Sequence, residues 1–407
     1  MKRWFFSISL LGIFFFTAVA FISWQIRFPL VKSAPVGLNP KFYDYAGITH
    51  VHSNLSTGSG TIEDITRAAS KARCNFAIVT DLNTVPKNSA DAGYRDDVLV
   101  ILASEYSYLG GHLLTYGFPN SSSPFGLGMG QAQVIFNELL QQNPRPLKEG
   151  FLVAAHPFLP RHSWDNLQNS GLTGIEILNI DSIWRTALAQ NKLSIIWSFL
   201  ILPFNPDLSY LRLFVEPQRE LAAWDENLRK RFFVGFAGAD ATANAIPFPD
   251  KSIDFPSYTQ SFRLMKNHVL LKSELTGSYN EDRTKILEAL YRGSFYFSLD
   301  VIGDPTGFYF IAQKNIGHNH QEFVSGQTLP QGPAEFVVEL GREVEVPHEI
   351  VLLRNGQPVA TSNSSRLNYE TKTSGAYRAV VRVIPTLPPP DGKKWFPWIF
   401  SNAIRLE

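Results

Sequence analysis

Two histidines stand two residues apart in the stretch ITHVHSN, which covers Ile48–Asn54. The chain has only nine histidines among its 407 residues, so the spacing of His50 and His52 is a prominent feature. If this stretch is a β-strand, both imidazoles project from one face, because the side chains of a strand repeat with a period of two. Two imidazoles on a shared face suit a metal ion. Taken alone, such a pair is also compatible with two ordinary core histidines.

Other residues that can bind metals lie at the ends of apolar runs further along the chain. Asp81 ends NFAIVTD, Glu105 ends VLVILASE, and His112 begins the run GHLLTYG. His156 follows FLVAA, and Asp240 ends FVGFAGAD. The active site of a strand–helix barrel lies where its strands end, so we expect these side chains to meet there. Imidazole together with carboxylate suits zinc, manganese or iron, and the sequence predicts a divalent-metal site.

Short apolar runs alternate with helical patterns from Tyr45 to Ser298. The stretch TIEDITRAASKA is expected to form a helix, with Thr61 as its N-cap and Asp64 three residues later in a capping box. Strands separated by helices predict an α/β fold with parallel strand–helix units. One run without charge, Leu193–Phe204, is too short to cross a bilayer. We expect a buried core helix there, with a helix resting on a membrane as the alternative.

The pattern changes after about Asp300, where no long helical period remains. Alternating runs such as HEIVLLRNGQPVATS predict strands, and Asn355–Gly356 within that run predicts a hairpin turn. The sequence therefore predicts a small all-β sandwich over residues 300–407.

The N-terminal segment is apolar and uncharged from Trp4 to Trp24, after Lys2 and Arg3. About 20 such residues are enough for a helix that spans a bilayer. We expect residues 1–27 to be an uncleaved membrane anchor and residues 28–44 a linker. The alternative is a signal peptide cleaved after Ala20, which would make the protein secreted. In either case the folded body is expected on the exported side of the membrane, periplasmic or extracellular.

Composition excludes some classes of function. The 37 Lys and Arg residues nearly balance the 36 Asp and Glu residues, and no basic cluster suggests nucleic acid as a partner. Cys74 is the only cysteine, so the chain has neither an internal disulfide framework nor a thiolate zinc site.

The order of the motifs resembles a known family. HVHSN, VTDLN, Glu105 with GGHLLTYG, AAHP and GADAT follow one another as in the polymerase and histidinol phosphatase (PHP) superfamily. The resemblance covers roughly Tyr45–Ser298. It implies a distorted (β/α)7 barrel over residues 45–299 and metal-dependent phosphoesterase activity on a small phosphorylated substrate. The sandwich behind it resembles the appended domain of some exported, membrane-anchored PHP proteins.

Three positions depart from the superfamily pattern, because residues that hardly bind metals replace expected ligands. These positions are Thr57, Leu82 and Thr242. By the resemblance, all three would serve the same one of three metal ions. The ligands of the other two ions are present, namely His50, His52, Glu105, His112, His156 and Asp240.

The resemblance therefore implies a site with two metal ions. One ion would be held by His50, His52 and Asp240. The other would be held by His112 and His156, and Glu105 would bridge the two.

Two functions remain open at this point. The first is a phosphoesterase with a reduced, dinuclear site of zinc, manganese or iron. The second is a PHP pseudoenzyme that acts as a binding or interaction module. Arg161 and His162, just past AAHPFLP, are candidates for contact with an anionic substrate, although both are equally compatible with solvated loop residues.

Overall fold

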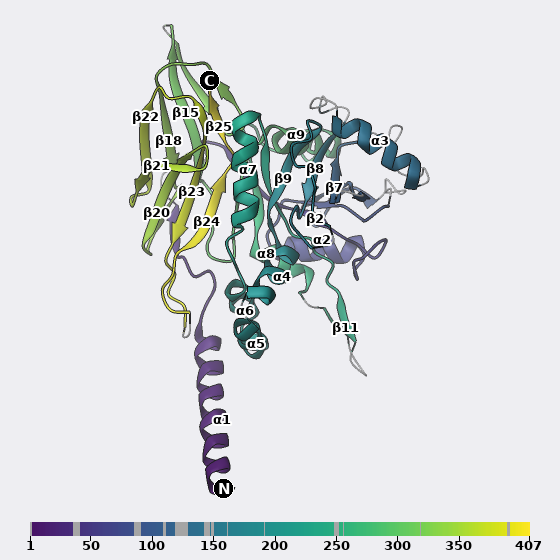
Figure 1. The fold of residues 1–407 in the computed structure, drawn as a ribbon, viewed down its shortest axis with the longest axis vertical. Helices are drawn as coiled ribbons and strands as arrows, with labels where there is room; N and C mark the ends of the chain where they lie inside the picture. The colour runs from purple at the N-terminus through teal and green to yellow at the C-terminus, as the bar shows by residue number, and fades with distance from the viewer. Residues whose placement is uncertain are drawn as a thin grey trace.

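The computed structural model of the chain has a mixed α/β part followed by a part built almost entirely of strands (Figure 1). The structure describes residues 2–35, 41–84, 91–108, 111–118, 129–141, 147, 150–160, 162–190, 192–247, 252–254, 256–317, 319–388 and 391–407.

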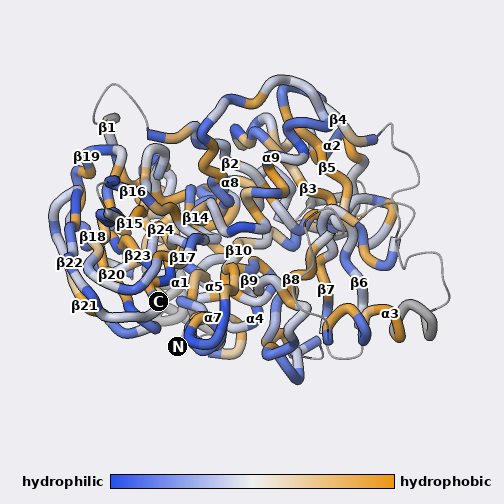
Figure 2. The backbone as a smooth tube through the Cα atoms, turned by 90° about the horizontal axis from the view of Figure 1, so that it is seen from above, coloured by the Kyte–Doolittle hydropathy of each residue, from blue (hydrophilic) through white to orange (hydrophobic). Residues whose placement is uncertain are grey.

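One sheet of the α/β part has five strands in the order β10–β9–β8–β7–β6. Strands β8, β9 and β10 are parallel, whereas β7 runs antiparallel to both of its neighbours. Figure 2 shows hydrophobic stretches along β7 to β10, and every residue of these four strands is buried. The bounds are Ser104–Tyr108 (β6), Gly111–Tyr116 (β7), Phe151–Ala155 (β8), Leu172–Asn179 (β9) and Val234–Gly238 (β10).

A twelve-stranded sheet runs through both parts of the chain. Its strands from the α/β part are β2 (Tyr43–Val51), β3 (Phe76–Val79), β4 (Gly93–Arg95), β5 (Val98–Leu102), β13 (Lys266–Leu271) and β14 (Phe295–Ser298). Its later strands are β17 (Thr328–Leu329), β20 (His348–Arg354), β21 (Gln357–Ser362), β23 (Gly375–Val383), β24 (Phe396–Ser401) and β25 (Ile404–Leu406). The antiparallel pairing of β14 with β24 joins the two parts, so one hydrogen-bonded sheet crosses the predicted boundary at residue 299.

The distorted (β/α)7 barrel predicted over residues 45–299 does not close into a barrel within the described residues. The two sheets meet instead at isolated bridges, one between Leu82 and Glu105 and one between Val51 and Ala241. The hairpin of β6 and β7, in which β7 also pairs antiparallel with β8, is a second departure from the predicted parallel strand–helix repeat. The α/β part of the chain is therefore built on two sheets instead of one closed barrel.

Helices cover these sheets. The predicted capping box at the start of α2 is confirmed, since Asp64 N donates to Thr61 Oγ1 at 3.2 Å and Thr61 N donates to Asp64 Oδ2 at 3.0 Å. The bounds are Lys2–Gln25 (α1), Ile62–Lys71 (α2), Met129–Gln141 (α3), Ile180–Gln190 (α4), Lys192–Ile201 (α5), Pro206–Arg212 (α6), Gln218–Lys230 (α7), Tyr258–Leu264 (α8) and Tyr279–Arg292 (α9).

The C-terminal part is a pair of facing sheets. A four-stranded sheet of β16 (Asn319–Val324), β15 (Tyr309–Ile316), β18 (Ala334–Glu339) and β22 (Arg366–Thr371) packs on the end of the long sheet. The ring of Phe336 stacks on Tyr377 across the layers, with centroids 4.1 Å apart. Asn355 and Gly356 lie between β20 and β21 with φ of 51° and 82°, which is the conformation a tight hairpin turn requires. Short pairs remain outside, namely β1 (Ser33–Pro35) with β19 (Arg342–Val344) and β11 (Ala245–Pro247) with β12 (Ser252–Asp254).

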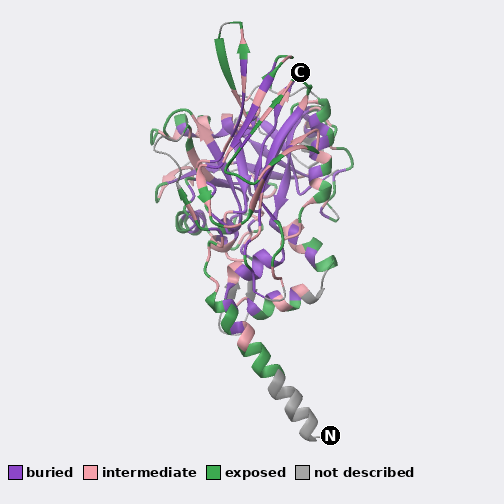
Figure 3. Cartoon of the chain, turned by 90° about the vertical axis from the view of Figure 1, so that its left-hand side faces the viewer, coloured by how far each residue is buried: buried purple, intermediate pink, exposed green. Residues whose placement is uncertain are grey.

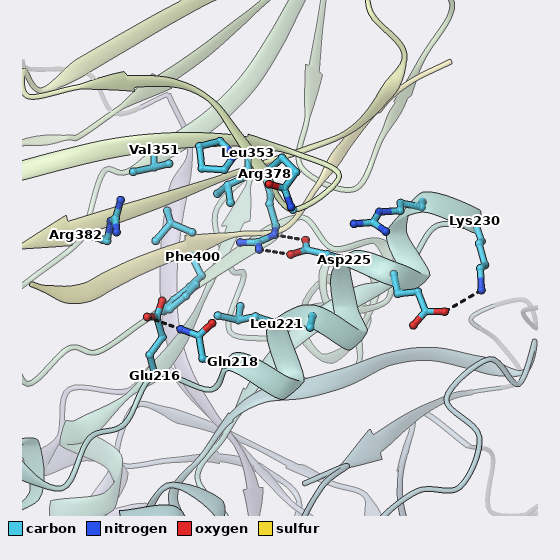
Figure 4. A pocket seen from close by; sticks show the side chains of 17 residues that line it. Glu216, Gln218, Leu221, Asp225, Lys230, Val351, Leu353, Arg378, Arg382 and Phe400 are labelled. Carbon is cyan, nitrogen blue, oxygen red and sulfur yellow. Dashed lines mark hydrogen bonds and ion pairs between the residues drawn. The ribbon is translucent and has the colours of Figure 1, made fainter.

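A buried ion pair ties α7 to the C-terminal strands. Arg378 of β23 donates from Nε and Nη2 to the two carboxylate oxygens of Asp225, both at 2.7 Å (Figure 4). The guanidinium also lies over the Trp224 ring, 5.0 Å from its centroid. Planar, bidentate pairs of this kind fix orientation as well as distance.

The end of α1 contacts the body near α5 and α6. The side chain of Asn205 donates to the carbonyl oxygens of Ser23 and Ile26, at 2.9 and 3.0 Å. Figure 3 shows exposed residues along the described part of α1 that precedes this contact. Within the described part of the chain no helix is long and apolar enough to span a membrane, so the transmembrane helix predicted over residues 1–27 is not supported.

Helix α5 is buried on one side and exposed on the other. Ile195 and Ser198 are buried, whereas Ile196 and Phe199 on its other side are 57% and 48% exposed. The expected buried core helix is therefore found for one side of α5, whereas the apolar side with Ile196 and Phe199 is largely exposed.

Candidate metal centre

The structure brings the six predicted metal ligands together from five strands. His50 lies on β2 and His52 directly after it, Glu105 lies on β6, His112 on β7, His156 directly after β8, and Asp240 two residues after β10. All six are nearly buried, and the most exposed side chain is that of Asp240, at 14%.

Glu105 is the centre of the cluster, and its two carboxylate oxygens face different histidines. Oε1 lies 2.9 Å from Nδ1 of His112, 3.2 Å from Nε2 of His156 and 3.4 Å from Nε2 of His50. Oε2 lies 3.3 Å from Nε2 of His52. One carboxylate thus contacts histidines from three separate strand ends.

His50 and His52 approach Asp240 on the other side. Nε2 of His50 is 3.4 Å, and Nε2 of His52 is 3.5 Å, from Oδ1 of Asp240. Two sets of side chains have ligand atoms close enough to hold an ion, namely His50 with His52 and Asp240, and His50 with Glu105 and His156. His112 is outside both sets and reaches the cluster through Glu105; its other nitrogen is 3.3 Å from Ser107 Oγ.

The convergence of His50 and His52 does not arise from regular strand alternation. His50 has a φ of 60°, and the pairing of β2 with β3 shifts register between Ile48 and Val51. His156 and Asp240 also have positive φ, 28° and 47°. Such backbone is strained for residues other than glycine, and strain of this kind gathers at functional sites. The two rings end 5.2 Å apart because the strand is irregular where they leave it.

The reversed direction of β7 explains the place of His112. In the ladder, His112 near the start of β7 pairs with Ser107 of β6 and with Ala155, the last residue of β8. Because β7 is antiparallel to both neighbours, its beginning lies at the edge where they end. His112 therefore faces the same site as residues that end parallel strands.

Glu176 of β9 was missed by the sequence analysis and is central to the site. Its Oε1 accepts a hydrogen bond from Nδ1 of His50 at 2.7 Å, and its Oε2 accepts one from the backbone N of His156 at 2.8 Å. The side-chain amide of Asn179 donates to Glu176 Oε2 at 3.0 Å and lies 3.2 Å from Asp240 Oδ2. Glu176 and Asn179 together contact all three ligands with positive φ. The available signal was a single carboxylate inside the otherwise apolar run GIEIL.

Asp81, the other acidic strand end, does not join the cluster. Its carboxylate accepts hydrogen bonds from Ser53 N at 2.7 Å and from the hydroxyls of Ser53 and Ser56, both at 2.6 Å. Ser56 Oγ in turn lies 3.4 Å from Nδ1 of His52. Asp81 therefore holds the loop after β2 instead of facing Glu105.

The three departures from the superfamily pattern lie on the same side of the site as this loop. Thr57 is exposed, Leu82 pairs with Glu105 only through its backbone, and the carbonyl of Thr242 accepts a hydrogen bond from Ser59 N at 2.9 Å. None of these side chains offers a carboxylate or an imidazole.

The electrostatics of the cluster favour a cation. Burial alone would lower the pKa of His50, but Glu176, Asp240 and Glu105 raise it well above the usual value. Burial alone would raise the pKa of Glu105, but His50 and the hydrogen bonds from His112 and His156 lower it well below the usual value. His50 holds its proton strongly because the positive charge offsets the buried carboxylates around it. A metal cation at this place would offset them in the same way.

Two buried nitrogens also lack partners. Nε2 of His50 and Nδ1 of His156 make no hydrogen bond to any described residue. Buried polar groups are normally satisfied, so Nε2 of His50, which faces the carboxylates of Glu105 and Asp240 at 3.4 Å, fits a metal ligand. The donor set of imidazoles and carboxylates suits zinc, manganese or iron.

The two predicted substrate contacts have different outcomes. Arg161 lies outside the described residues. His162 is exposed beside the cluster, with its ring centroid 4.3 Å from that of His112 and 6.2 Å from that of His156. Burial and the neighbouring His112 and His156 lower the pKa of His162. The structure places His162 within reach of a ligand at the centre, and its contact with substrate stays a prediction.

Comparison with solved structures returns PHP-like proteins. One is a two-domain protein of Bacteroides vulgatus described as containing a predicted PHP-like metal-dependent phosphoesterase; it is 10% identical, with a TM-score of 0.38 over 90% of this chain and 98% of that chain. Another neighbour, from Bifidobacterium adolescentis, is described as a candidate metal-dependent phosphoesterase; it is 13% identical, with a TM-score of 0.30 over 51% of this chain and 92% of that chain. No family model and no curated protein matches the chain.

Proposed function

We propose that this chain is a metal-dependent phosphoesterase with a dinuclear centre. The observation that carries the proposal is the position of Glu105, whose Oε1 faces His112, His156 and His50 while Oε2 faces His52. The two oxygens of this carboxylate thus face different histidines, as expected of a ligand shared between two metal ions. Two-metal hydrolases hold their ions roughly 3.5–4 Å apart in this way.

The six proposed ligands can be assigned to two ions. His50 belongs to both sets of close ligand atoms, but its Nδ1 is bound to Glu176, so only Nε2 is free to bind one ion. We assign it to the ion of His52 and Asp240. The second ion then takes His156 and His112, with Glu105 shared between the ions.

The chemistry follows from this arrangement. Divalent ions in such a site polarise phosphate oxygens and lower the pKa of water toward neutrality. The chain itself fixes the ligands, because Glu176 holds His50 and the backbone of His156, and Asn179 contacts Asp240. Burial of the cluster excludes most water and strengthens electrostatic interactions with a phosphate group.

Metal content and turnover test the proposal. Purified protein is expected to carry close to two ions of zinc, manganese or iron per chain by elemental analysis, and to hydrolyse 4-nitrophenyl phosphate. Glu105→Ala is expected to lose at least one ion and the activity, whereas Glu288→Ala on the exposed face of α9 is the matched control. A Glu105→Ala protein with an unchanged metal count would refute the bridging role.

The same experiment addresses the alternative function. A wild-type protein that is metal-free and inactive, and that added Mn²⁺ or Zn²⁺ does not rescue, would be a PHP-like binding module. The replaced positions Thr57, Leu82 and Thr242 are the feature that keeps this alternative open.

We also propose that the body lies on the exported side of a membrane. Support comes from the uncharged run Trp4–Trp24 and from exposed apolar side chains on two adjacent helices, where the rings of Phe15 and Trp197 lie 5.9 Å apart. Protease added to intact cells or spheroplasts is expected to digest the region from Tyr45 onward. Full protection of that region would contradict this placement.

A further inference from the structure

A cavity of about 510 Å³ borders the metal centre. Among the polar residues that line it, His156 and Asn179 are buried, and both belong to the centre: His156 faces Glu105, and Asn179 lies 3.2 Å from Asp240. Because the ligands themselves are nearly buried, a substrate needs a path to them. The cavity provides one that ends at the ligand His156 and at Asn179, the neighbour of Asp240.

Four parts of the chain form the walls of the cavity. They are the turn after β8, the end of β9, one side of helix α4, and the segment that leads into α7 together with the first turn of α7. On α4 the lining residues Ser182, Thr186 and Ala189 recur at helical spacing, so a single face of this helix forms one wall.

The lining is suited to an organic group. Phe158, Ile183 and Val215 supply apolar surface, and the guanidinium carbon of Arg219 lies over the Phe158 ring, 4.5 Å from its centroid. Small-molecule sites usually have volumes of roughly 300–1,000 Å³ with mostly apolar walls and a few polar groups. This cavity is much larger than a single phosphate group requires.

We infer that this cavity binds the organic part of the phosphate ester, and that this part is a ring-sized, partly apolar group such as an aryl group. The inference rests on the proposed phosphoesterase function and adds a substrate class to it. The phosphate would lie at the ligand cluster, next to His156, while the organic group lies between Phe158 and helix α4.

Two phosphate esters that differ only in the organic group test the inference. Binding of 1-naphthyl phosphate and of methyl phosphate to the intact, Mn²⁺-loaded protein is measured by isothermal titration calorimetry. We expect 1-naphthyl phosphate to bind at least tenfold more tightly. Thr186→Trp, at an exposed position that lines the cavity, is expected to weaken 1-naphthyl phosphate at least tenfold and methyl phosphate less than twofold.

Leu188→Trp is the matched control, because Leu188 lies on the same helix, is 53% exposed and does not line the cavity. It is expected to leave both affinities unchanged. If Thr186→Trp does not fold, Ala189→Phe blocks the same wall. Equal affinity for the two esters, or wild-type binding of 1-naphthyl phosphate by the blocked variants, would overturn the inference.

These outcomes are separable from those of the proposed function. Hydrolysis of both esters with Glu105-dependent metal binding, but without any effect of Thr186→Trp, leaves the phosphoesterase proposal standing and overturns the cavity inference. Tight binding of 1-naphthyl phosphate that Thr186→Trp abolishes, without turnover, supports the cavity and overturns the phosphoesterase proposal.

Discussion

Replacing Glu176 with glutamine is expected to weaken metal binding although Glu176 is not itself an assigned ligand. The carboxylate accepts hydrogen bonds from three donors, namely Nδ1 of His50, the backbone N of His156 and the side-chain amide of Asn179. Glutamine has one oxygen and one amino group at the same places. The NH2 group of the glutamine must therefore face a hydrogen-bond donor, either on the His50 side or on the side of His156 and Asn179.

Either orientation of the glutamine disturbs the centre. If its amino group faces His50, the imidazole must accept at Nδ1 and carry its proton on Nε2, which is the nitrogen needed by the metal. If its amino group faces the other side, the hydrogen bonds to His156 and Asn179 are lost. Substitution of such outer partners usually reduces metal affinity 10–100-fold, or about 1.4–2.7 kcal/mol.

The assay is titration of the metal-free variant with Co²⁺, whose visible spectrum reports both affinity and coordination geometry. Glu176→Gln is expected to bind Co²⁺ at least tenfold more weakly and with an altered spectrum, while the matched surface variant Glu288→Gln behaves as wild type. A Glu176→Gln protein with wild-type affinity and spectrum would refute the reasoning. A loss of thermal stability alone would assign Glu176 a purely structural role.

Two further predictions concern the body of the protein. Arg378→Ala is expected to reduce the free energy of unfolding by about 3–5 kcal/mol, because it leaves the buried carboxylate of Asp225 unpaired; in denaturant titrations the loss should shrink when Asp225→Ala is added, and simple additivity would contradict it. Burial alone would lower the pKa of His268, but Asp44 and Asp300 raise it to about 10. The charged imidazole therefore contributes its full share to the free energy of unfolding below the ordinary pKa of 6.5, and this contribution is lost as the pH rises toward 10. The free energy of unfolding should therefore fall between pH 7 and pH 9.5, by at most about 3 kcal/mol, and His268→Gln should lack this slope. A wild-type protein with the same slope as the variant would count against the prediction.

Several local features could be predicted from the sequence because they depend on neighbours in the chain. The capping box of Thr61 and Asp64 and the turn at Asn355–Gly356 involve residues at most three apart, and both occur as predicted. The switch to strands after Asp300 also follows from a local pattern. Within the described residues, no helix follows α9.

Long-range features could not be predicted in the same way. The sequence suggested one barrel, but the direction of β7 depends on which distant strands it pairs with, and its apolar run GHLLTY suits either direction. The same ambiguity concerns Glu176, because a carboxylate in an apolar run reveals its role only when its partners are known.

The sequence by itself determined which side chains could form the centre, because only imidazoles and carboxylates at strand ends can supply such a ligand set, and their order along the chain is readable. Only the tertiary structure decided how they meet. His50, His156 and Asp240 reach the cluster through positive φ angles that no local propensity favours. Such strained backbone persists only where surrounding contacts hold it, and here those contacts come from Glu176 and Asn179 on a different strand.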